Sequence, residues 1–152
     1  MTAFSKYSPY FALIARLWVG GVLAYAGFMK LLEPTANFQA SLEQYTLIPP
    51  VLLPFLAKTI PWMEWIGGIF LMLGYLTQAC AFLFALFSLA FIAVLSGLFW
   101  TGAAGKGCGC FGQSGFTLTV SQAYILDWVN LILSSFIAFR KKQVLSLDQL
   151  FR

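Results

Sequence analysis

The fold is decided by residues 79–100, which read ACAFLFALFSLAFIAVLSGLFW and contain no charged residue. As an α-helix rising 1.5 Å per residue, this stretch is about 33 Å long, enough to cross the ~30 Å hydrocarbon core of a bilayer. The rest of the chain has the same character, since 61% of its 152 residues are hydrophobic and 9% are charged. Soluble domains carry far more charge. The sequence therefore predicts an integral membrane protein that contacts the lipid bilayer.

Three further apolar runs flank this stretch, at residues 10–32, 52–73 and 120–139. Each is close to the ~20 residues that a transmembrane helix needs. The more polar residues 33–50 are expected to hold one short helix, from about Thr35 to Tyr45. No repeat or composition shift indicates a second domain. We therefore predict an all-α, polytopic membrane protein whose residues 1–152 form a single bundle of four transmembrane helices.

Small residues mark one face of the first predicted span. Gly20, Ala24 and Gly27 are spaced by four and three residues, so they lie on one side of a helix. Such a ridge lets another helix approach closely in a membrane. This face is predicted to point into the bundle.

The distribution of basic residues predicts the topology. Five lie on the side of the termini, and three lie toward the other side. An excess of Lys and Arg marks the cytoplasmic side. We therefore expect cytoplasmic termini in the inner (plasma) membrane and an extracytoplasmic loop at residues 101–119. The five residues are Lys6, Arg140, Lys141, Lys142 and Arg152.

That loop contains two of the three cysteines, in the motif Gly107-Cys108-Gly109-Cys110-Phe111-Gly112. A disulfide between residues i and i+2 closes a small ring and departs from relaxed geometry. Strained disulfides are readily reduced, which suits exchange chemistry. Cys108 and Cys110 are therefore predicted to be the catalytic thiol pair. The supporting residues of the loop are Lys106, whose charge favours thiolate, Gly109, Phe111 and Gly112.

Other functional classes are excluded by composition. The chain has no histidine, so Ser-His and Cys-His catalysis are ruled out. The net charge of +4 comes from basic residues spread along the chain, without the basic stripe of nucleic-acid-binding proteins. Cys80 lies a membrane thickness away from Cys108 and is expected to be an unpaired, buried apolar residue.

Four ionisable residues form a predicted intramembrane charge network: Arg16, Lys30, Glu64 and Asp127. An unpaired charge in a transmembrane helix costs about 2.5–3.5 kcal/mol on insertion scales. Residues counted from the extracytoplasmic helix ends place Arg16 and Glu64 at similar depth, so these two are expected to pair. Lys30, near the end of its helix, can snorkel to the interface or reach toward Asp127. The network has two readings, a structural ion-pair network or a role in proton handling.

Several of these segments resemble the MauE branch of the DoxX-like membrane proteins. They are, in order, Gly27–Leu31 with Pro34, Tyr45–Pro49, Ile60–Glu64 with Gly67 and Gly68, and Cys108–Gly112. The resemblance implies a four-helix membrane bundle with a redox role in methylamine utilisation. It further implies a thioredoxin-like extracytoplasmic partner that matures a disulfide-rich enzyme subunit. Cys108 and Cys110 would be the exchanging pair, with Lys30 and Glu64 as the membrane-embedded family positions.

Three alternative functions stay open at this point. DoxX-like proteins are also linked to sulfur-compound oxidation with quinone as acceptor, so quinone is a candidate cofactor. The paired thiolates could instead carry a soft metal ion such as Cu(I), although two cysteines without histidine fall short of a closed zinc site. In the third alternative, the chain is an assembly subunit whose cysteines merely close the loop.

Overall fold

The computed structural model describes residues 4–44, 48–100, 107–112 and 118–140. Within them, the only pairing outside helices and turns is an isolated β-bridge between Gly107 and Thr119. The predicted all-α class is confirmed. The helices are α1 (Phe4–Leu32), α2 (Thr35–Glu43), the 3₁₀ helix η1 (Pro50–Leu52), α3 (Leu53–Leu73), α4 (Thr77–Trp100) and α5 (Val120–Ala138).

Three helices in the described part of the chain are long and apolar enough to cross a membrane. They are Tyr10–Leu32 in α1, Thr77–Gly97 in α4 and Val120–Ala138 in α5, which match three of the four predicted spans. The remaining predicted span, residues 52–73, is also helical but is not among them. Lys58, Pro61 and Glu64 interrupt the apolar sequence of α3.

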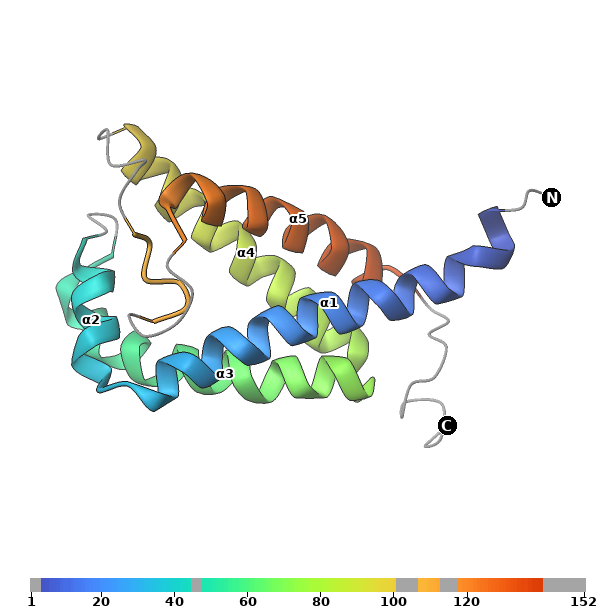
Figure 1. The fold of residues 1–152 in the computed structure, drawn as a ribbon, viewed down its shortest axis with the longest axis horizontal. Coiled ribbons are helices and arrows are strands. Elements are labelled where there is room, and N and C mark those ends of the chain that lie inside the picture. The colour runs from blue at the N-terminus through green and yellow to red at the C-terminus, as the bar shows by residue number, and fades with distance from the viewer. Residues whose placement is uncertain (1–3, 45–47, 101–106, 113–117, 141–152) are drawn as a thin grey trace.

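The long helices form two antiparallel pairs, α1 with α3 and α4 with α5 (Figure 1). Helix α2 lies across the end of the bundle that is opposite to the start of α1 and the end of α5. The first turns of α3 pack beneath it, because Phe38 and Leu42 of α2 share a core with Leu53, Ala57 and Ile60. This end of the molecule is therefore capped by α2.

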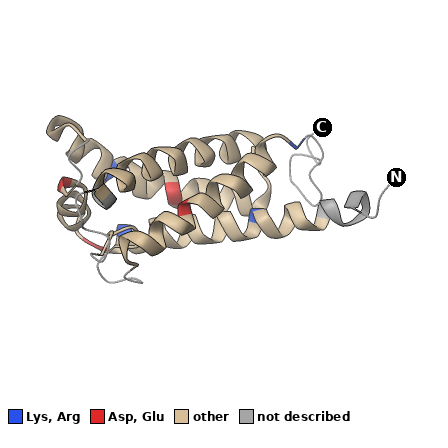
Figure 2. Ribbon diagram, turned by 90° about the horizontal axis from the view of Figure 1, so that it is seen from above, with Lys and Arg blue, Asp and Glu red and all other residues tan. Residues whose placement is uncertain are grey.

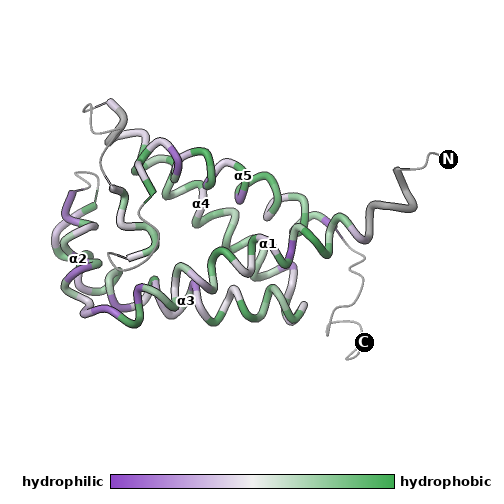
Figure 3. Tube along the Cα trace, viewed as in Figure 1, coloured by the Kyte–Doolittle hydropathy of each residue, from purple (hydrophilic) through white to green (hydrophobic). Residues whose placement is uncertain are grey.

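The outer surface of the bundle suits lipid. Figure 3 shows that the long helices are mainly hydrophobic, with more polar segments around α2. Figure 2 shows how few charged residues the helices carry. Large apolar side chains stay exposed on several helices, at a density that would be a liability in water. They include Phe11, Ile14, Trp18, Phe55, Phe82, Leu86, Ile125 and Ile132.

Candidate functional site

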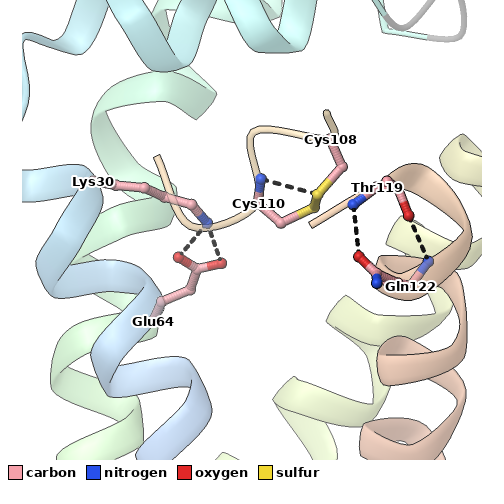
Figure 4. Close-up of a disulfide and its surroundings, with 6 residues drawn as sticks. All are labelled: Lys30, Glu64, Cys108, Cys110, Thr119 and Gln122. Carbon is pink, nitrogen blue, oxygen red and sulfur yellow. Dashed lines mark hydrogen bonds and ion pairs between the residues drawn. A yellow bond between two sulfur atoms is a disulfide. The ribbon is translucent and has the colours of Figure 1, made fainter. Parts of the chain in front are cut away.

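The cysteine loop lies in the bundle under α2, between the α1–α3 pair and the start of α5 (Figure 4). Cys108 and Cys110 are joined as a disulfide, with their Cα atoms 5.3 Å apart. Backbone hydrogen bonds shape the loop: the Cys108 amide donates to the Leu118 carbonyl at 3.0 Å, and the Gly112 amide donates to the Gly109 carbonyl at 3.1 Å. The Cys110 amide also donates to the Cys108 sulfur at 3.1 Å.

The end of the loop is fixed by the beginning of α5. Thr119 caps this helix, since its hydroxyl accepts from the Gln122 amide and the Gln122 side chain accepts from the Thr119 amide. This reciprocal pair is a capping box. Our reading of the sequence overlooked it, although the Thr-x-x-Gln pattern at 119–122 was visible. Because Gly107 forms its β-bridge with Thr119, the first residue of the cysteine motif lies beside the N-cap of α5.

The disulfide is largely shielded from solvent. The Cys108 residue is 3% exposed and packs in the core cluster beneath α2, while Cys110 is half-buried. Phe111 is buried and contacts the Tyr25 ring on α1, with centroids 5.9 Å apart. A thiol from outside can therefore reach the Cys108 sulfur only if α2 or the loop moves.

Gly109 packs closely against Ser41 of α2. Its φ is +66°, a left-handed conformation that side chains disfavour. A Cβ atom there would lie 2.6 Å from the Ser41 hydroxyl oxygen and 2.7 Å from the Ser41 Cβ. Gly112, at φ +76°, meets Glu33 in a similar way. Glycine is therefore required by both the conformation and the close packing.

Replacing Gly109 with alanine is expected to destabilise the protein by about 1–2 kcal/mol, through overpacking and left-handed strain. Thermal unfolding in detergent micelles would measure the loss. The matched control is Gly107→Ala, because an added Cβ at Gly107 meets no atom within 4 Å. Equal melting temperatures for the two variants would contradict the proposed packing of the loop on α2.

The structure pairs Lys30 with Glu64. The Lys30 ammonium donates to both carboxylate oxygens, at 2.8 and 2.6 Å, and the two side chains are 1% and 5% exposed. The ammonium also lies over the Phe38 ring, 4.8 Å from its centroid. The predicted pairing of Arg16 with Glu64 is therefore wrong. Lys30 lines the same cavity as Asp127, but its ammonium is held by Glu64.

The error has a physical cause. The first two turns of α3 pack against α2, so α3 begins further toward α2 than the point at which α1 ends. Residues counted from the two helix ends therefore do not lie at equal depth. Arg16 lies near the other end of α3, where its guanidinium donates to the Met72 carbonyl at 3.3 Å.

A small cavity of about 40 Å³ lies between the cysteine loop and helices α1, α3, α4 and α5. Cys110, Lys30, Glu64 and Asp127 all line it, together with two polar residues that our sequence reading did not single out, Ser88 and Asn130. Neither of these has a spacing or motif that signals function. They become visible only because α1, α3, α4 and α5 converge beneath the loop.

The cavity limits what the site can hold. Its volume leaves room for water and is far below the roughly 300–1,000 Å³ of pockets for small organic ligands. It is smaller than a pocket that encloses an organic cofactor such as a quinone. In the disulfide form, neither sulfur offers a thiolate to a metal, and the described residues contain no group of three or more His, Cys, Asp or Glu side chains placed to bind one.

Two predicted residues stand apart from this arrangement. Lys106 lies outside the described residues. Cys80 is in no disulfide among the described residues. It is partly buried against the core cluster of Val19, Leu71 and Phe84, and its thiol contacts the Tyr75 carbonyl at 3.9 Å.

Comparison with known proteins gives one match. The family model described as "Methylamine utilisation protein MauE" matches residues 8–140. The matched range includes most of α1, all of α2 to α5 and the cysteine loop. No curated protein and no solved structure matches the chain.

Proposed function

The chain belongs to the MauE family of methylamine-utilisation membrane proteins, and from this premise we propose that it is a thiol–disulfide redox protein. In this proposal, Cys108 and Cys110 exchange electrons with a thioredoxin-like extracytoplasmic protein. The partner's substrate would be a protein whose disulfides form or mature outside the cytoplasm.

One observation carries the proposal: the disulfide of the CGCFG motif is next to buried ionisable groups. A disulfide that only closed a loop would need no such neighbours. Here Cys110 lines the same cavity as Lys30, Glu64 and Asp127. Charged groups in a membrane are costly and are usually retained for function. Their position beside the sulfur supports chemistry at that sulfur.

We also propose the topology in which this chemistry takes place. Helix α3 would join α1, α4 and α5 as a fourth spanning helix, with its charge neutralised by the Lys30–Glu64 pair. The termini would be cytoplasmic, in line with the bias of basic residues. The cysteine loop would then face the compartment in which disulfides form and persist.

The proposal predicts that single-cysteine variants capture a partner. In cells that contain the thioredoxin-like partner, Cys108→Ser or Cys110→Ser in a Cys80→Ser background should accumulate a mixed disulfide, because the resolving sulfur is missing. Non-reducing gels followed by mass spectrometry would detect it. The matched control is the variant with both loop cysteines replaced by serine, which should give no adduct and no function.

Two outcomes would overturn the proposal. The first is full function of the double serine variant, which would make the chain an assembly subunit. The second is stoichiometric binding of Cu(I) by the two sulfurs in cells with no detectable disulfide, which would favour a metal carrier.

A further inference from the structure

The cavity beneath the loop is lined by one carboxyl group that is not part of the Lys30–Glu64 ion pair. Lys30 and Glu64 neutralise each other at 2.6 Å. Asp127 on α5 lines the same cavity, and no hydrogen bond or ion pair joins it to another described residue. A carboxyl in this position is not part of a structural salt bridge.

A second group in the cavity also lacks a partner. Asn130 lies one helical turn after Asp127, is 2% exposed, and its side-chain oxygen Oδ1 has no hydrogen-bond donor among the described protein atoms. Buried polar atoms are normally satisfied by protein or water. A cavity of about 40 Å³ has room for at least one water molecule, and a water there would supply the missing donor.

Cys110 is the sulfur that lines this cavity, whose mostly apolar wall also carries Lys30, Glu64 and Asp127. Cys110 packs against the edge of the apolar cluster under α2, whereas Cys108 is buried within that cluster. When a disulfide opens, one sulfur leaves as a thiolate. The cavity stabilises that charge better than the apolar cluster does, since a buried charge needs polar neighbours.

We infer that this cavity is a proton-transfer site, in which Asp127 exchanges a proton with Cys110 through one water molecule when the disulfide opens. The inference rests on the proposed thiol–disulfide function and adds a proton-carrying residue to it.

The step balances as follows. A thiolate of a dithiol partner attacks the Cys108 sulfur, a new S–S bond forms, and the bond to Cys110 breaks with its electron pair on the Cys110 sulfur. The protonated Asp127 carboxyl gives its proton, through water, to this thiolate and becomes a carboxylate. The partner's second thiolate then displaces Cys108. The partner is thereby oxidised by two electrons, and the loop pair is reduced by two.

The groups that face Asp127 across the cavity come from each surrounding element. They are Lys30 from α1, Glu64 from α3, Cys110 from the loop, and the uncharged Ser88 from α4. Lys30 and Glu64 hold each other with two hydrogen bonds. Asp127 is therefore the carboxyl that is not held by the ammonium and can exchange a proton.

The test is the pH dependence of disulfide reduction in the purified full chain, in lipid nanodiscs and in a Cys80→Ser background. Dithiothreitol serves as the probe dithiol, and thiols are trapped by alkylation at set times. After correction for the probe's thiolate fraction, the rate should fall as pH rises through the titration of Asp127. Asp127→Asn should slow reduction about 100-fold, a usual size for general acid catalysis, and should abolish this inflection.

Two variants make the result decisive. Asp127→Glu keeps the carboxyl and should keep an inflection at a shifted midpoint, which gives a reading even if Asp127→Asn fails to fold. Glu43→Gln removes an exposed carboxyl on α2 with the same charge change, and should leave the profile unchanged. An unchanged rate and profile in Asp127→Asn would overturn the inference. Capture of the thioredoxin-like partner by the single-cysteine variants would still stand in that case, so failure here is distinct from failure of the proposed function.

Discussion

Replacing Lys30 with methionine is expected to destabilise the protein by about 3–5 kcal/mol, the usual loss when one member of a buried ion pair is removed. The side chains of Lys30 and Glu64 are 1% and 5% exposed, so the Glu64 carboxylate is shielded from bulk solvent when the ammonium is lost. Methionine keeps much of the volume and removes only the charge. An unfolding titration with sodium dodecyl sulfate in mixed micelles would measure the free-energy difference.

A double-mutant cycle separates the pair from the rest of the site. Lys30→Met with Glu64→Gln removes both charges, so it should be less destabilised than Lys30→Met alone. The matched control is Lys58→Met on α3, because Lys58 is exposed; its loss should stay within about 0.5 kcal/mol. If Lys30→Met and Lys58→Met unfold at the same detergent fraction, the buried pair does not form in the membrane.

The helices could be predicted from the sequence because their signal is local. A run such as residues 79–100, with no charged residue, is satisfied in lipid only as a helix, and α4 is found at Thr77–Trp100. The small-residue face of α1 was predicted for the same reason, since Gly20 and Gly27 repeat at helical spacing. The level at which α3 begins could not be predicted. It depends on contacts between α2 and Leu53, Ala57 and Ile60, which join segments that are distant in sequence.

The candidate site likewise has features that the sequence predicts and features that depend on tertiary packing. The pair of cysteines and the need for glycine at positions 109 and 112 follow from the motif itself. Cys110, Asp127 and Asn130 come together only through the packing of α5 against the loop and α1. The burial of Cys108 under α2 was likewise not predictable, because a polar segment at residues 33–50 reads as a surface connection. Tertiary packing brings that segment over the disulfide.

The helix pair α1–α3 depends on Gly27, and Gly27→Ala is expected to lower the free energy of unfolding by about 3 kcal/mol, the upper end of the range for overpacking. A Cβ atom at Gly27 would lie 2.5 Å from the Trp65 amide nitrogen and 2.6 Å from the Pro61 carbonyl oxygen. Both are backbone atoms, so no rotation of a side chain relieves the clash. Helices α1 and α3 would have to separate, and Lys30, one turn further along α1, would move away from Glu64.

Gly21 provides the matched control on the same helix. A Cβ atom at Gly21 meets nothing within 4 Å, so Gly21→Ala should be neutral, or stabilising by up to about 1 kcal/mol because alanine favours the helix more than glycine does. Melting temperatures and detergent titrations of the two variants, measured side by side, therefore separate the effect of the α1–α3 contact on stability from the effect of helix propensity. A Gly27→Ala variant as stable as Gly21→Ala would show that α1 and α3 do not pack at this distance. The Lys30–Glu64 contact, which depends on the same approach of the two helices, would then be in doubt as well.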